Sequence, residues 1–91
     1  MIEYLFNTIV ASAGEDAVIS AVVRDNFGDV VTSGAELMLY SDTSLLETIK
    51  GKFDGEAWNF TIPAGNRKGR FFYSISVNNE SLCFKQAIYF K

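Results

Sequence analysis

The sequence has no histidine, and it has only one cysteine and one proline among its 91 residues. Without histidine it lacks a His-based acid or base, a Ser–His–Asp or Cys–His nucleophile and a His metal ligand. The single cysteine, Cys83, excludes an internal disulfide and a cysteine zinc cluster, and we expect it to be a small buried hydrophobe. Neither GxGxxG nor GxxxxGK[ST] occurs, so no phosphate-binding loop of these types is indicated. We therefore expect no catalytic residues, no cofactor, no metal and no enzyme activity.

Long apolar runs and a signal peptide are also missing. No apolar run approaches the roughly 18–20 residues that span a bilayer, so no membrane insertion is expected. Met1 leads straight into "IEYLFNTIV", with Glu3 where a signal peptide would carry positive charge. We expect synthesis in a cytoplasm without a signal peptide.

The charge balance is acidic and uneven. The net charge is −3, which argues against a general nucleic-acid binder because phosphate contact needs clustered Lys and Arg. Residues 1–47 hold eight acids and one base, whereas residues 48–91 hold seven bases and three acids. This asymmetry permits a polar face or head-to-tail self-association, but charged residues on solvated loops are the preferred explanation.

The dominant pattern is an apolar residue at every second position, which is typical of half-buried strands. Turn residues separate the alternating segments, as in "DNFGD", "KFDGE" and "PAGNRKG". The expected strands are seven, at about residues 3–11, 17–25, 35–41, 45–50, 56–62, 69–77 and 81–90. Seven short strands with frequent turns predict an all-β antiparallel sandwich that forms one domain over residues 1–91.

Two segments leave alternatives open. We expect residues 43–50 to form an edge strand, but Ser44 followed three residues later by Glu47 also suits a short capped helical turn. In the last predicted strand, the spacing of Leu82 and Phe84 suggests that both side chains lie on the same face of the strand. After them, either Ala87 and Tyr89 continue that face beyond a bulge, or Ile88 and Phe90 stay on it.

The stretch "RKGRFFYSIS", residues 67–76, joins a basic turn to three aromatic residues. Alternation points Phe71 and Tyr73 inward beside Trp58, which shares its face with other apolar residues and is expected to anchor the core. Phe72 then points to the opposite face. There it joins two residues of another strand and the basic loop as the candidate partner-binding site: Phe72, Tyr40, Met38, Arg67, Lys68 and Arg70.

Two other functions suggested by local sequence are not favoured. The stretch "RKGRFFYSIS" is close to a signature of the RNA-recognition motif, but that fold needs two helices and the sequence offers none. Asp25 and Asp29 in "DNFGD" carry oxygen ligands suited to calcium. Aspartate also favours such turns for local reasons, through bonds to backbone N–H groups, so we expect no metal there.

Three segments carry a resemblance to a known family: "ISAVVRDNFGDVV", "GEAWNFTIPAG" and "GRFFYSISV". Their order is similar to that in bacterial and phage immunoglobulin-like domains, and more narrowly in small β-sandwich accessory proteins of tailed-phage virions. The resemblance covers about residues 17–91. The chain departs from the invasin-type pattern, since Gly28-Asp29-Val30 replaces Gly-x-Pro, and it lacks the Cys…Trp…Cys framework of antibody domains.

The resemblance implies a seven-stranded antiparallel immunoglobulin-like β-sandwich with a structural or adhesive role. The protein would be a virion component of a phage or prophage, in the capsid decoration, tail or neck. Its partner would be a virion protein or a second copy of itself, with cell-surface carbohydrate as a further ligand. The alternative is a stand-alone cytoplasmic interaction module, an inhibitor or adaptor, that binds one protein through the face of Phe72, Tyr40 and Met38.

Overall fold

The computed structural model describes residues 1–78, 80–81 and 85–91, and these residues form strands and loops without a helix. None of them therefore belongs to a helix able to cross a bilayer. The strands are β1 (Ile2–Asn7), β2 (Val10–Ala11), β3 (Ala17–Val23), β4 (Ala35–Ser41), β5 (Ser44–Lys50), β6 (Lys52–Phe53), β7 (Trp58–Ile62), β8 (Gly69–Val77), β9 (Glu80–Ser81) and β10 (Gln86–Phe90).

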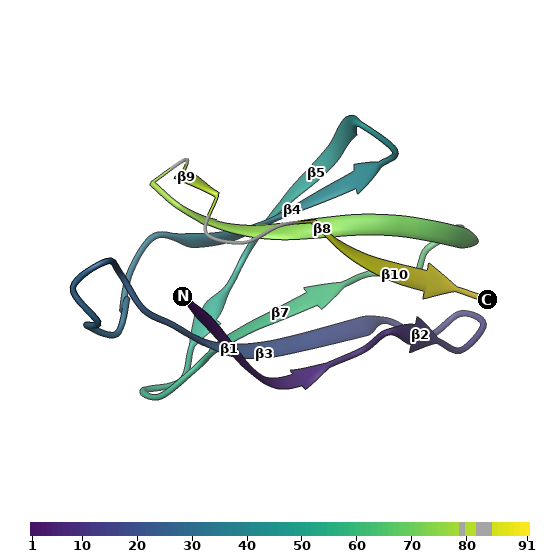
Figure 1. Ribbon diagram of the computed structural model, residues 1–91. Coiled ribbons are helices and arrows are strands. Elements are labelled where there is room, and N and C mark those ends of the chain that lie inside the picture. Colours follow the sequence, from purple (N-terminus) through teal and green to yellow (C-terminus); the bar gives the residue numbers. More distant parts are fainter. Residues whose placement is uncertain (79, 82–84) are drawn as a thin grey trace.

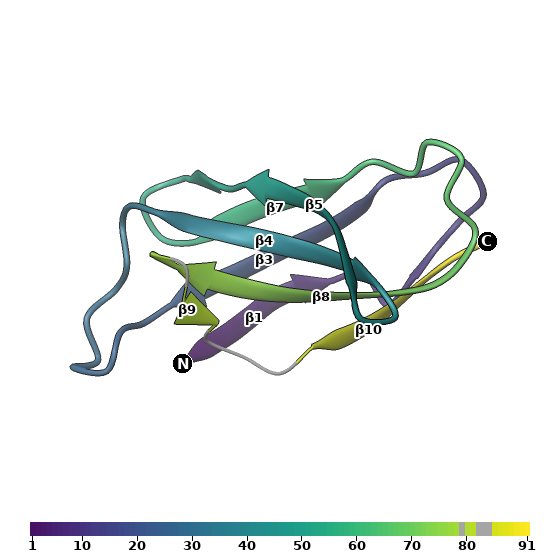
Figure 2. The same cartoon turned by 90° about the horizontal axis from the view of Figure 1, so that it is seen from above.

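The strands form two sheets that face each other as two layers (Figure 1, Figure 2). The first sheet, called sheet A, has the order β1-β3-β7-β6. The second, sheet B, has the order β2-β10-β8-β4-β5, and β9 pairs with β8 outside this path. The predicted all-β sandwich is confirmed.

The first predicted strand, residues 3–11, is in fact two strands in different sheets. β1 pairs with β3 in sheet A, and β2 then pairs with β10 in sheet B. Thr8 lies between them, and its hydroxyl exchanges hydrogen bonds with the backbone of Val18, at 3.0 and 3.1 Å. The β2–β10 pair is parallel, so the expectation of purely antiparallel pairing is wrong for this pair.

The segment around residues 45–50 is an edge strand, as expected, and the alternative helical turn is not formed. β5 pairs antiparallel with β4 and ends sheet B. After Gly51 the chain passes to sheet A as β6, a two-residue strand that the sequence did not predict. The chain therefore changes sheets at both lateral edges of the sandwich, once after β1 and once after β5.

Alternation places the core as predicted. In β3, Ala17, Ile19, Ala21 and Val23 are buried, and the residues between them point outward. Similar inward rows come from both sheets: Leu37, Leu39, Trp58, Phe60, Ile62, Tyr73, Ile75, Ile88 and Phe90 are all buried. These rows meet in one hydrophobic cluster between the layers.

The predicted aromatic residues take their expected faces, with different neighbours. Trp58 is buried, stacks with Phe60, meets Phe53 in a tilted arrangement, and donates from Nε1 to the carbonyl of Val31 at 2.7 Å. Phe71 is half-buried and meets Phe90 edge to face, with ring centroids 5.8 Å apart.

In the last strand, Ile88 and Phe90 are the inward residues, whereas Ala87 and Tyr89 face solvent. This settles which of the two patterns holds within β10. The expectations for Leu82, Cys83 and Phe84 concern residues that lie outside the described part of the chain.

Candidate functional site

The outer face of sheet B carries an aromatic row across its central strands. Tyr40 of β4 lies opposite Phe72 of β8, and Phe72 lies opposite Ala87 of β10. Met38 precedes Tyr40 by two positions and so shares its face. The structure therefore brings together three residues that the sequence nominated, Met38, Tyr40 and Phe72, and all three are half-buried.

Each ring of this row has a cation above it. The Lys85 Nζ lies 3.9 Å from the centroid of the Tyr40 ring, and the Arg70 guanidinium carbon lies 5.5 Å from that of Phe72. Both separations allow a favourable cation–π interaction, worth about 0.5–1 kcal/mol at exposed sites. We call this set, Met38, Tyr40, Arg70, Phe72 and Lys85, the aromatic–cation face.

Lys85 was not among the residues nominated from the sequence, although alternation offered a signal. It precedes Ala87 by two positions, and Ala87 faces outward, so a continuing strand would point Lys85 to the same face. Because Lys85 and Arg70 cover the rings, the face presents fixed positive charge over apolar surface. Such a surface is complementary to an acidic or polar partner.

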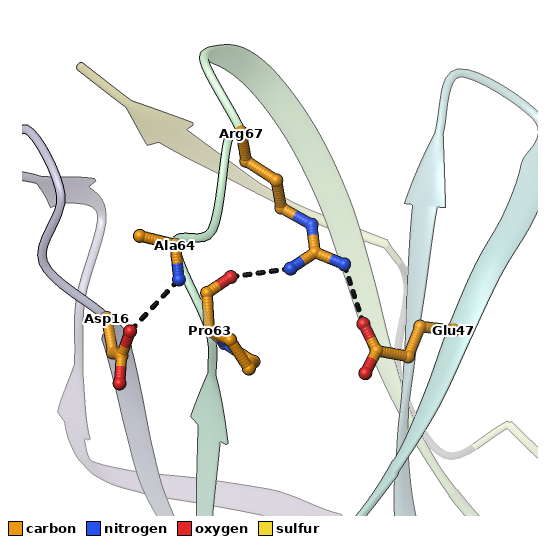
Figure 3. Close-up of polar contacts among 5 residues, drawn as sticks. All are labelled: Asp16, Glu47, Pro63, Ala64 and Arg67. Atoms are coloured by element: carbon orange, nitrogen blue, oxygen red, sulfur yellow. Dashed lines mark hydrogen bonds and ion pairs between the residues drawn. The ribbon is translucent and has the colours of Figure 1, made fainter.

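The basic loop divides into residues with different surroundings. Arg67 donates from Nη2 to the Glu47 carboxylate at 2.6 Å, and from Nη1 to the carbonyl of Pro63 (Figure 3). It thus ties the edge strand β5 to the β7–β8 loop. Lys68 is exposed on that loop, and of the three basic residues only Arg70 lies over an aromatic ring of the face.

The turn nominated for calcium is closed by its own hydrogen bonds. The Asp25 Oδ1 accepts from the backbone N–H groups of Phe27, at 2.9 Å, and Asp29, at 3.0 Å. Arg24 donates from Nη1 to the carbonyl of Gly28 at 3.0 Å. Within residues 1–78, 80–81 and 85–91, no group of three or more His, Cys, Asp or Glu side chains is placed to hold a metal ion.

The same turn presents Phe27 to solvent, with 90% of the residue's surface exposed. The sequence identifies this residue only as part of the turn, because an aromatic residue in a loop gives no periodic signal. The side chain adds nothing to the core, while the hydrogen bonds around it hold the backbone in place.

Comparison with known proteins informs the fold. No family model and no curated protein sequence matches the chain. Among solved structures, the Lin-41 filamin domain matches with a TM-score of 0.70 at 18% identity, covering 99% of this chain and 91% of that one. The fold is immunoglobulin-like.

A second solved structure, of domains 4 and 5 of the S-layer protein SbsC, matches with a TM-score of 0.59 at 15% identity. The match covers 99% of this chain and 50% of that one, so the present chain spans half of that structure. The immunoglobulin-like β-sandwich expected from the sequence is therefore confirmed. At these identities the comparisons establish the fold, and the resemblance to phage proteins stays a prediction.

Proposed function

We propose that this protein is a non-enzymatic structural or adhesive accessory, acting as a component of a phage or prophage particle. It would bind through the aromatic–cation face to a protein of that particle, with an acidic or polar surface as the complement. Domains with this fold commonly serve as structural or interaction modules, and both solved structures above are of this general kind.

The observation that carries the proposal is the arrangement of Tyr40 and Phe72 beneath Lys85 and Arg70. Aromatic and Arg side chains are enriched where protein interfaces gain most of their binding energy. The cross-strand pairing of Tyr40 with Phe72 fixes both rings on a sheet, so little side-chain freedom is lost when a partner binds. This face differs in charge from the acidic chain as a whole, which favours attraction of an acidic partner.

Mass spectrometry of purified particles from the source organism tests the location. We expect the protein to be present at stoichiometric copy number. Its consistent absence from particles, together with capture of one soluble host protein, would instead favour the stand-alone cytoplasmic module.

Substitution tests the binding face. Phe72→Ala is expected to weaken partner binding by about 2 kcal/mol, as is typical for truncation of an aromatic anchor. Phe27→Ala is the matched control, because it removes the same side chain from a distant loop. Equal binding by the Phe72→Ala variant and the unaltered protein would contradict the assignment of this face. Release of the partner by soluble oligosaccharide would identify the ligand as carbohydrate instead.

A further inference from the structure

The two lateral edges of the sandwich differ sharply in charge. One edge is formed by β1, the last strand of sheet A, and β2, the last strand of sheet B. Residues 4–14, which contain most of β1 and all of β2, include no charged residue. The opposite edge is formed by β5 and β6, and the equally long segment 47–57 contains Glu47, Lys50, Lys52, Asp54 and Glu56.

Charged side chains are a common means of keeping an edge strand from pairing with another chain. The β5–β6 edge has them, and the Arg67 ion pair with Glu47 covers part of it. The β1–β2 edge carries one charge, Glu3 near the start of β1, and has neither charge nor proline between residues 4 and 14. It is therefore the edge that is open to pairing.

The β1–β2 edge also exposes large apolar side chains. The exposed fractions are 58% for Leu5, 58% for Phe6, 66% for Ile9 and 52% for Val10. We call these four residues the apolar seam. Leu5 also lines a groove of about 490 Å³ together with Val22, Val30 and Phe53, and Arg24 and Glu56 add charged groups to its lining.

A bulge at Leu5 explains why two neighbouring residues are both exposed. Tyr4 pairs with Ala21 and Phe6 pairs with Ser20, so Leu5 is an extra residue in β1. A bulge breaks the alternation of inward and outward side chains and turns an additional one to solvent. Leu5 and Phe6 therefore leave apolar area in water that a partner would cover.

Backbone groups on this edge are also directed outward. Thr8 donates to the Val18 carbonyl and Met1 accepts from Arg24, so these residues of the β1 segment face β3. Alternation then directs the N–H and C=O groups of Ile2 and Asn7 away from β3.

We propose that the apolar seam is a self-association surface, and that two copies of this chain pair through it about a two-fold axis to form a closed dimer. This goes beyond the proposed function, because the seam is separate from the aromatic–cation face. In an antiparallel arrangement centred near Phe6, the two Phe6 side chains meet, and Glu3 of each copy lies toward the Ile9 region of the other. No like charges are opposed.

The contrast between the edges favours a second copy over an unrelated strand. Pairing of seam with seam uses the single open edge of each copy, and the dimer then ends on two charged β5–β6 edges. Association stops at two copies because no open edge remains, which is the closure expected of an isologous contact. One open and one protected edge per chain is the pattern that such a dimer requires.

Light scattering coupled to size exclusion tests the proposal. The mass of the unaltered protein is expected to rise with concentration toward twice 10.1 kDa and to stop there. Phe6→Lys brings two ammonium groups together at the axis and is expected to raise the dissociation constant about tenfold or more. Circular dichroism confirms that each variant is folded.

Leu46→Lys is the matched control, because Leu46 is 49% exposed on β5, at the opposite edge, and the substitution adds the same charge. We expect it to dimerise as the unaltered protein does. A mass of 10.1 kDa at every concentration, growth beyond a dimer, or equal weakening by the control would overturn the proposal.

Hydrogen exchange provides a second readout that does not depend on substitution. The amides of Ile2 and Asn7 are expected to exchange more slowly as the protein concentration rises, because pairing protects them. Exchange at these two amides that is independent of concentration while the mass doubles would place the contact elsewhere and overturn the assignment.

Discussion

At the scale of single residues, three aspartates serve local structure through their carboxylates. Asp16 accepts from the backbone N–H of Ala64 at 3.0 Å and so joins the start of β3 to the loop after β7 (Figure 3). Asp25 closes the β3–β4 turn, and Asp54 closes the turn between β6 and β7. Part of the acidity of this chain is therefore used to satisfy backbone donors in turns.

Asp54 makes the folded state sensitive to acid. Hydrogen bonds from the backbone N–H of Ala57, at 2.8 Å, and of Glu56, at 3.0 Å, and from the Asn59 side chain lower the pKa of its carboxyl below the ordinary 3.8. A lowered pKa in the folded state means that the charged carboxylate stabilises the fold above pH 3.8. That contribution is lost as the pH falls through the lower, folded-state pKa.

We therefore expect Asp54→Asn to lower the melting temperature at neutral pH, and the gap to the unaltered protein to shrink as the pH falls below 3.8. Thermal unfolding followed by circular dichroism over this pH range measures the gap. Glu56→Gln in the same turn removes an equal charge and serves as the control. A gap for Asp54→Asn that stays constant across the range would show that the carboxylate bonds do not carry the effect.

At the scale of elements, alternation predicted the long strands well. It located β3, β4, β5, β7 and β8 within a few residues, because each has one face in the core and the other toward solvent. Alternation does not reveal which sheet a strand joins, so the division of residues 3–11 between two sheets was missed. β6 has two residues, too few for any period to be recognised.

Gly51 marks the passage from β5 in sheet B to β6 in sheet A, and its lack of a side chain is required by packing. A Cβ at this position would lie 2.6 Å from Phe60 Cε1 and 2.8 Å from Trp58 Cε3. Both partners are buried, so neither ring has free space to move into. The link between β5 and β6 therefore passes directly over the aromatic part of the core.

Gly51→Ala is expected to reduce the free energy of unfolding by about 1–3 kcal/mol, which is the usual cost of overpacking a core. Urea denaturation measures the change. In a Phe60→Leu background, where the nearest ring atoms are gone, the same substitution is expected to cost less, since contacting residues are not additive. An equal cost in both backgrounds would assign the effect to the Trp58 contact or to the backbone of the link, and not to the Phe60 contact.

At the scale of the whole molecule, the sequence located one surface and missed others. The alternation of inward and outward side chains predicted that Met38, Tyr40 and Phe72 share one outer face. The prediction holds because β4 and β8 are neighbours in sheet B, which makes Tyr40 and Phe72 cross-strand partners. Lys85 precedes β10 and meets Tyr40 only through the folding of distant segments. The contrast between the two edges likewise depends on strand order within each sheet, which local sequence patterns do not specify.

The two sheets are expected to unfold together. The core cluster combines residues of sheet A, such as Ile19 and Phe60, with residues of sheet B, such as Leu37 and Ile75. Neither sheet can lose its partner without exposing this shared apolar surface, so a single cooperative transition follows. The chain also crosses between the sheets at both edges, through Thr8 and through Gly51, which couples them covalently as well.

Trp58, the only tryptophan, provides a probe in sheet A, while far-ultraviolet circular dichroism reports on both sheets. In urea, the two signals are expected to give the same midpoint and the same slope. Refolding is expected to take milliseconds to seconds, because β2 near one end of the chain pairs with β10 near the other and such distant pairing is slow to form. A fluorescence transition at lower urea than the dichroism transition would show that sheet A opens first, and would contradict a core shared equally by the two layers.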